Sequence, residues 1–574
     1  MKGTRVRPML RTLAAVIALG LPALPATGQE ADPGAFLAAR VADRVNDYAE
    51  AARQYRRALL ADPGNLPILR SAAVTTVAAG EIERAVPMAE MLFEAGASDE
   101  LTPLLLLVRD VRAGNWAEAL AVLDRSEEAV NPLLGGLIRA WIQVALDDAE
   151  GAIEQLADLD QNEAMLRFAQ YHTALIQALS GDLAPASATL EGGEEGEPLR
   201  LNRGTVIVRA ELLAATGDRE GAIGVLEDAL ALGFGDVELA EMRDRLARGE
   251  TLDFARVGSP AEGVAEVLFN FADALGDDRA RRALVYSRLA TYLSPGFTEA
   301  LIRSSEILED QEQFALAIET YAQVPQGSPQ FLSAERGRAQ ALRADDRADE
   351  AIGVLTGLNR SYPEEILVLY DLGELLREAE RYEESAEVLT RAIDLIGEPE
   401  TRHWLFFYTR AIAHERAGDW EQAEPDFRRA LELEEDQPLV LNYLGYTLVE
   451  RREKLDEALA MIERAVEQRP ESGFITDSLG WVLYRLERFE EAVAPMERAV
   501  ELEPTDPVIN DHLGDVYWKV GREREAIFQW RRALSFDPET EEADRIRRKL
   551  EVGLDEVLEE EAAAETEGRS DDGG

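Results

Sequence analysis

The chain has 574 residues, of which 46% are hydrophobic and 30% charged, which excludes a disordered chain or a multispan membrane protein. Asp and Glu number 111 against 60 Lys and Arg, giving a formal charge of -51 that argues against nucleic acids and anionic lipid surfaces as partners. The absence of Cys excludes disulfides and thiolate chemistry, and only four His are present.

Residues 1–28 predict a secretory signal peptide. Basic residues between Lys2 and Arg11 precede an apolar run over 13–24, and small residues Ala26 and Gly28 favour cleavage before Gln29. The run is too short to span a bilayer comfortably, because about 20 apolar residues are needed. No lipoprotein Cys follows, so we expect a periplasmic protein that is not a lipoprotein. An uncleaved anchor or a disordered arm is the alternative.

A repeat of about 34 residues runs through the rest of the chain. Ala recurs at intervals of 33 to 37 residues, with one gap of 61, at Ala51, Ala85, Ala119, Ala152, Ala186, Ala222, Ala283, Ala317, Ala351, Ala386, Ala423, Ala458, Ala492 and Ala526. In the last three repeats a Leu-Gly pair precedes this Ala (Gly445, Gly480, Gly514), and a Pro follows it (Pro470, Pro504, Pro538). The small residues let two antiparallel helices approach closely, and the Pro ends the second helix.

This pattern resembles the tetratricopeptide repeat (TPR). The resemblance implies an all-α, right-handed solenoid of about fourteen helix-turn-helix units, and the gap in the series favours two halves. We expect a divergent N-terminal solenoid over 29–247 with an extended loop at 191–198, a junction at 248–258 and a C-terminal solenoid over 259–540. A capping helix over 541–558 and an acidic, disordered tail over 559–574 complete the predicted organisation.

No catalytic motif accompanies the repeats. His414-Glu415 lacks the second His of a zinc-protease motif, since position 418 is Gly418. His403 and His414 are eleven residues apart, about 16 Å along a helix, and cannot share an ion. The Gly residues at 192–196 lie among Glu residues that would repel a phosphate. We therefore predict no enzyme activity, no cofactor and no metal site.

The last repeats predict a partner-binding groove. In TPR arrays the first helix of each unit lines the concave face, and the aromatic and hydrogen-bonding residues at its lining positions are typical of interface anchors. The predicted groove residues are Asn442, Tyr446, Asp477, Trp481, Tyr484, Arg485, Asp511, Asp515, Trp518 and Lys519. The alternative is that the large aromatic residues only pack between neighbouring repeats. Asp477 and Asp511 have the wrong sign for binding a carboxylate, which favours a basic or neutral segment.

A more specific resemblance covers about 259–550. The strings LNYLGYTLVER, ITDSLGWVLYRL, INDHLGDVYWKVGREREA and SPAEGVAEVLFNFADAL are similar to those of long TPR proteins of the Gram-negative envelope. That resemblance implies an adaptor that scaffolds a carboxyl-terminal processing protease with its cell-wall hydrolase substrates. The better-understood members of that family are lipoproteins, whereas this chain has no Cys to carry the lipid.

These observations favour a non-enzymatic periplasmic scaffold that binds proteins through its concave face. The alternative is an assembly factor for envelope polysaccharide or secretion machinery, in which Trp481 and Trp518 stack on sugars. A wall-acting enzyme is a third interpretation, for which the sequence offers no motif. The sequence does not predict an oligomeric state.

Overall fold

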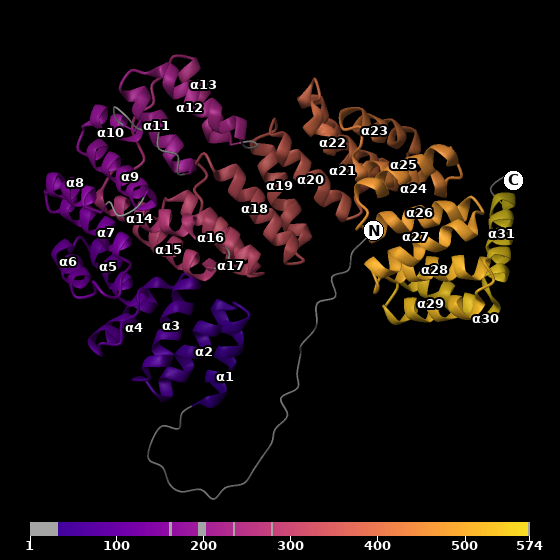
Figure 1. Cartoon of the computed structure of the whole chain (residues 1–574), viewed down its shortest axis with the longest axis horizontal. Coiled ribbons are helices and arrows are strands. Elements are labelled where there is room, and N and C mark those ends of the chain that lie inside the picture. Colours follow the sequence, from indigo (N-terminus) through magenta and orange to yellow (C-terminus); the bar gives the residue numbers. More distant parts are fainter. Residues whose placement is uncertain (1–31, 160–162, 193–201, 233–235, 277–278, 572–574) are drawn as a thin grey trace, which may run out of the picture. The chain divides into compact units, whose positions relative to one another are not determined.

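The computed structural model describes residues 32–159, 163–192, 202–232, 236–276 and 279–571. Within these ranges the chain is helical and contains no β-strand, which confirms the predicted all-α fold (Figure 1). The predicted signal peptide over 1–28 and most of the predicted loop over 191–198 lie outside the described residues.

The chain divides into two compact units, Met1–Ala334 and Glu335–Gly574. The helices of the first unit are α1 (Pro33–Arg44), α2 (Tyr48–Ala61), α3 (Leu66–Ala78), α4 (Ile82–Glu94), α5 (Leu101–Ala113), α6 (Trp116–Asp124), α7 (Pro132–Ala145), α8 (Ala149–Ala157), α9 (Glu163–Leu179), α10 (Leu183–Leu190), α11 (Arg203–Ala215), α12 (Arg219–Leu232), α13 (Val237–Ala247), α14 (Pro260–Ala274), α15 (Ala280–Leu293), α16 (Thr298–Asp310) and α17 (Phe314–Tyr321). Helix α18 (Phe331–Ala344) crosses the division.

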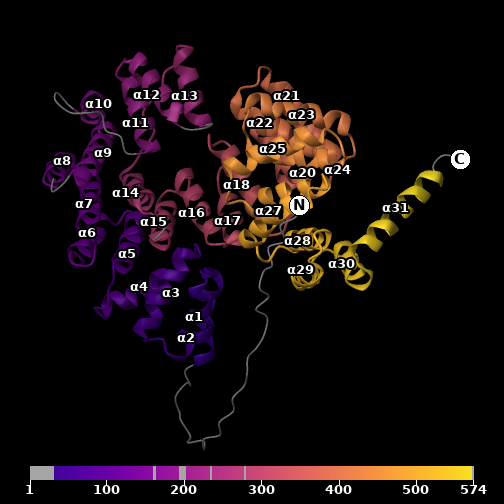
Figure 2. The same cartoon turned by 45° about the vertical axis from the view of Figure 1, so that its right-hand side comes forward.

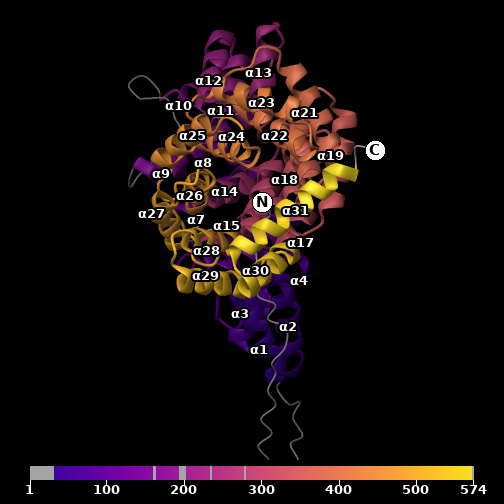
Figure 3. The same ribbon diagram turned by 90° about the vertical axis from the view of Figure 1, so that its right-hand side faces the viewer.

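The helices of the second unit follow α18. They are α19 (Ala348–Ser361), α20 (Ile366–Glu378), α21 (Tyr382–Ile396), η2 (Thr401–His403), α22 (Trp404–Arg416), α23 (Trp420–Leu433), α24 (Pro438–Glu450), α25 (Leu455–Gln468), α26 (Gly473–Arg485), α27 (Phe489–Leu502), α28 (Pro507–Lys519), α29 (Glu523–Ser535), α30 (Thr540–Val552) and α31 (Leu554–Asp571). Figure 3 shows how the pairs α24/α25, α26/α27 and α28/α29 succeed one another.

Each repeat is a pair of antiparallel helices, which we call helix A and helix B. In the first unit the odd-numbered helices from α1 to α11 are A helices, and in the second unit α20, α22, α24, α26 and α28 are. Side-chain caps and Pro start many of them: Asp506 accepts a hydrogen bond from the Ile509 amide at 2.9 Å, and Pro507 opens α28. A left-handed residue often separates A from B, such as Gly418 with φ 83° or Glu487 with φ 58°.

Helices α14 and α15 depart from simple stacking. They run back across the A helices of their own unit, where α14 contacts α7 and α9 and α15 contacts α3 and α5 (Figures 1 and 2). The irregular segment before α14, predicted as a junction at 248–258, falls inside the first unit, and its Leu252 and Val257 are buried. The division of the chain into compact units comes later, between Ala334 and Glu335.

The C-terminal end differs in form from the predicted cap and tail. The segment predicted as one capping helix over 541–558 contains the end of α30, a break at Gly553 and the start of α31. Helix α31 continues to Asp571, through most of the segment predicted as a disordered tail, and extends away from α30 (Figure 2). Ion pairs of Arg548 with Glu560 and of Arg545 with Glu561 stabilise its first half against α30.

Candidate partner-binding surface

Close packing against helix B uses one face of each A helix in the second unit. A Cβ added to Gly445 would lie 2.8 Å from Ile462 Cγ1, and one added to Gly480 would lie 2.5 Å from Met496 Cγ. Only glycine allows so close an approach. The second, fifth, ninth and twelfth residues of the A helices are spaced by three or four residues, so they share another face. We call this face the A-face.

Most predicted groove residues lie on the A-face, but several are buried. Trp481 in α26 is only 8% exposed. Its ring stacks on His512 at a centroid distance of 4.0 Å and on Tyr484 at 4.8 Å. Its Nε1 donates a hydrogen bond to Glu450 Oε1 at 2.6 Å. Trp481 therefore joins three successive A helices to one another.

A buried His–Asp pair lies beside this stack. His512 of α28 is held 3.0 Å from Asp477 Oδ2 of α26 through its Nδ1. Burial alone would lower the pKa of His512, but the carboxylates of Asp477, Asp511 and Asp515 outweigh it and raise the pKa above its usual value. Burial also raises the pKa of Tyr446, and the carboxylates of Glu450 and Asp477 add to that effect.

The predicted groove residues of α28 contact the C-terminal helices. Lys549 of α30 is fully buried and lies 2.7 Å from both Asp511 Oδ2 and Asp515 Oδ1. Asp515 also accepts a hydrogen bond from Trp530 Nε1 at 2.9 Å. On α31, Asp555 accepts hydrogen bonds from Trp518 and Lys519. These contacts close the end of the array.

The remaining predicted residues, Asn442, Tyr446 and Arg485, are half-buried. Asn442 Oδ1 is buried and finds no hydrogen-bond partner among the described residues. The structure thus gives Trp481 a packing role between repeats, as the alternative interpretation of the sequence expects for the large aromatic residues. Asp477 and Asp515 are likewise engaged by His512 and Lys549. A role of the predicted set in binding a partner stays a prediction.

A different set of A-face residues is exposed, and none of its members belongs to the groove predicted from the sequence. The second residue of four successive A helices is a large apolar residue: Leu367, Leu405, Leu439 and Phe474, which are 37%, 38%, 44% and 43% exposed. They recur at intervals of 38, 34 and 35 residues, so a regular spacing of apolar residues just inside each helix start was the available signal. We call these four residues the apolar row.

Acidic residues accompany the apolar row. The turns that lead into its helices carry the exposed residues Glu364, Glu400, Glu435 and Glu471, each three to five positions before a member of the row. Glu400 pairs with Arg402 at 3.2 Å and Glu471 with Arg498 at 3.0 Å. No ion pair involves Glu364 or Glu435 among the residues described. The surface is therefore apolar with an acidic border.

In the first unit α14 and α15 cover four of the A helices, α3, α5, α7 and α9. Gly263 of α14 lies so close to α7 that an added Cβ would fall 2.2 Å from the Trp141 ring. Trp141 is fully buried and donates a hydrogen bond to His172 Nδ1 at 3.1 Å. Burial without a charged partner lowers the pKa of His172 to about 3, so this imidazole stays neutral.

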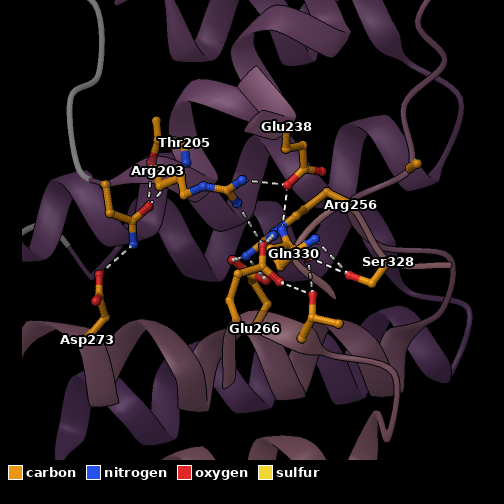
Figure 4. A network of polar contacts seen from close by, with 12 residues as sticks. Arg203, Thr205, Glu238, Arg256, Glu266, Asp273, Ser328 and Gln330 are labelled. Atoms are coloured by element: carbon orange, nitrogen blue, oxygen red, sulfur yellow. Dashed lines mark hydrogen bonds and ion pairs between the residues drawn. The ribbon is translucent and has the colours of Figure 1, made fainter. Parts of the chain in front are cut away.

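A buried polar network fixes α14 in place (Figure 4). Glu266 accepts hydrogen bonds from Tyr171 and Arg256, both at 2.9 Å. Arg256 comes from the irregular segment before α14 and also donates to Glu299 at 2.6 Å. The side chains of Arg256 and Glu266 are 8% and 2% exposed. Their mutual neutralisation makes this burial tolerable.

The network extends to the end of the first unit. Arg203 of α11 pairs with Asp236 and Glu238, both at 2.5 Å. Glu238 accepts a further hydrogen bond from Gln330, which contacts Ser328 (Figure 4). These bonds tie α11 and α13 to the segment before α18. This polar network therefore has a structural role within the first unit.

Metal-ligating clusters and membrane-spanning helices are both absent from the described part of the chain. No group of three or more His, Asp or Glu residues there is arranged to hold a metal ion. Nor does any helix in the described ranges have the length and apolar character needed to cross a membrane.

Sequence comparison identifies the repeats. The tetratricopeptide repeat family matches residues 336–398, 408–473 and 450–507. Residues 336–507 are tetratricopeptide repeats. The chain is also 32% identical over 180 residues to the TPR repeat-containing protein PA4667 of Pseudomonas aeruginosa, a match over 31% of this chain. It spans only 30% of the length of that curated relative.

The solved structures that match this chain are distant from it in sequence and have low TM-scores. The Cut9-Hcn1 hetero-tetramer of the APC/C matches at a TM-score of 0.38 and 14% identity, over 91% of this chain and 96% of that one. A TPR protein of Parabacteroides merdae matches at a TM-score of 0.37 and 18% identity, over 44% of this chain and 98% of that one. MamA (AMB-1) matches at a TM-score of 0.26 and 23% identity, over 29% of this chain and 97% of that one. The TPR assignment depends on the sequence match and on the helix pairs described above.

Proposed function

We propose that this protein is a non-enzymatic scaffold whose second unit holds partner proteins on the apolar row. TPR repeats are protein-interaction modules, and the observation that supports this site is the exposure of four large apolar residues at equivalent positions. Single exposed apolar residues are common, but a repeated series on one side of an array is typical of an interaction surface. Trp481 and Trp518 are engaged within the chain, which disfavours the alternative of sugar stacking.

We place this scaffold in the periplasm on the pattern of residues 1–28, and we propose envelope proteins as its partners. The resemblance of residues 259–550 to envelope adaptors supports a carboxyl-terminal processing protease and cell-wall hydrolases as candidates. The lack of a lipoprotein Cys supports a scaffold that is not lipid-tethered.

Site-specific photo-crosslinking tests this function. A photoreactive residue replaces Leu439 in the apolar row. The matched control places it at Leu395 on α21, which is a B helix. The native side chains are 44% and 45% exposed. In cells that express the full chain, position 439 should form adducts with an envelope protease or hydrolase, and position 395 should not. Equal adducts at both positions, or none at 439, would contradict the proposed site.

A further inference from the structure

The first described helix, α1, has an apolar side that no other described element covers. Leu37, Val41 and Val45 lie on and directly after α1 and are 63%, 67% and 60% exposed. Their spacing of four residues places them in one line along the helix. The opposite side of α1, with Ala35, Ala39 and Ala42, is buried. Terminal repeats of a solenoid usually present a polar outer face, so this apolar line is unusual.

Two basic side chains lie beside this apolar line. Arg40 and Arg44 border the line of Leu37, Val41 and Val45, both are exposed, and no ion pair involves either of them among the described residues. Residues 32–62 contain five Arg and five acidic residues, so this segment lacks the acidic excess of the whole chain, whose charge is -51. We call Leu37, Arg40, Val41, Arg44 and Val45 the α1 stripe.

The α1 stripe complements the apolar row in both character and charge. Apolar side chains on one surface meet apolar side chains on the other, and Arg40 and Arg44 meet the acidic border that includes Glu364 and Glu435. Leu37 and Val45 are about 12 Å apart along a helix, and neighbouring A helices pack about 10 Å apart. The stripe therefore has the length to contact two members of the row.

We propose that the α1 stripe of one copy docks on the apolar row of a second copy. This inference rests on the proposed function, because it names a second copy of this chain as one occupant of the same surface. The two contact surfaces differ, so the interface is heterologous and each copy retains one free stripe and one free row. Association is then head-to-tail, and it weakens as salt screens the charges.

Sedimentation velocity of the full chain at low salt tests the proposal. The weight-average mass should rise between about 1 and 100 µM, and Arg40→Glu/Arg44→Glu should shift that rise at least ten-fold higher in concentration. Arg243→Glu/Arg248→Glu on and after α13 is the matched control, because it reverses two Arg elsewhere in the first unit, the half-buried Arg243 and the exposed Arg248. The control should associate like the wild type. Circular dichroism verifies that each variant is folded.

Charge exchange makes the test specific for the two surfaces. Glu364→Arg/Glu435→Arg, which reverses the border of the row, should also weaken association. An equimolar mixture of this variant with Arg40→Glu/Arg44→Glu should restore it, because each variant then offers the charge that the other requires. A mixture that remains monomeric while the wild type associates would overturn the proposal.

Other outcomes separate this inference from the proposed function. A wild type that is monomeric at every concentration overturns head-to-tail docking, whereas adducts at position 439 still support the scaffold. If that monomer sediments with phosphatidylglycerol vesicles and Arg40→Glu/Arg44→Glu does not, the α1 stripe binds anionic lipid and self-docking is excluded. Equal loss of association in the α13 control would attribute the effect to net charge and would also contradict the proposal.

Discussion

The two units use the same helix pairs but treat their A helices differently. In the first unit α14 and α15 cover the A helices α3, α5, α7 and α9, with Gly263 against Trp141 and a buried pair between Glu266 and Arg256. In the second unit the A-face starts with exposed apolar residues such as Leu439. A repeat array thus buries this side when its own helices cover it, and it leaves apolar side chains exposed when they do not.

The largest effect is expected from breaking the cover of the first unit. Glu266→Gln removes the more deeply buried of the two carboxylates that pair with Arg256 and leaves only Glu299. Removal of one partner of a buried ion pair costs up to about 3–5 kcal/mol. Hydrogen exchange of α14 should accelerate accordingly, while exchange in α26 stays unchanged. Glu364→Gln, at an exposed carboxylate without an ion pair, is the control and should alter neither. Unchanged protection of α14 in Glu266→Gln would contradict a structural role for the network.

A steric clash between α14 and α7 should have a smaller effect on stability. Gly263→Ala places a methyl group 2.2 Å from the Trp141 ring, so α14 must move, at a cost of about 1–3 kcal/mol. Gly353→Ala in α19 meets nothing within 4 Å and should be neutral or slightly stabilising. Hydrogen exchange of α7 and α14 measures the difference. Equal behaviour of the two variants would refute the close packing of α14 on α7.

Local sequence signals predict the repeats but not their long-range use. The close packing at Gly445 and Gly480 can be predicted from the sequence, because a small residue at a fixed place in each helix pair indicates close packing within one repeat. The packing of α14 on α7 depends on Gly263 and Trp141, which are 122 residues apart, and no local pattern reports that contact.

The candidate site shows the same limit. Trp481 is typical of an interface anchor in sequence, yet His512 and Glu450 from neighbouring repeats enclose it. Leu405 and Leu439 are typical of core residues in sequence, yet they are exposed because the second position of an A helix faces away from helix B. Whether such a residue is buried depends on contacts between repeats, which the period alone does not determine.

Two buried histidines should respond to pH in opposite directions. The raised pKa of His512 means that its contribution to stability is complete below the unfolded value of about 6.5 and disappears as pH rises through the folded pKa. The pKa of His172, lowered to about 3, means that its contribution is complete above about 6.5 and falls as pH decreases. As pH falls, His512 therefore adds stability to the second unit, while His172 removes stability from the first unit.

Hydrogen exchange of α9 and α28 at pH 8 and pH 5.5 checks this contrast. From pH 8 to 5.5, the stability advantage of the wild type over His512→Gln should grow, whereas its advantage over His172→Gln should shrink by about 1 kcal/mol. Equal changes in both helices would show that the two imidazoles do not have these opposite environments.

The smallest effect on stability is expected in the apolar row itself. Leu439→Ser and Leu395→Ser each remove an exposed side chain, so each should change the free energy of unfolding by less than about 0.5 kcal/mol. Thermal unfolding followed by circular dichroism tests this. A large loss for Leu439→Ser alone would mean that Leu439 packs within the chain and is not free for a partner.

Cysteine reactivity tests the contrast between the two units most directly, because the natural chain has no Cys. Leu439→Cys and Thr102→Cys place one thiol at the second residue of an A helix in each unit, where the native residues are 44% and 2% exposed. A soluble maleimide should label the thiol at 439 at least 100-fold faster than the thiol at 102. Similar rates at both positions would contradict a covered first array and an open second one.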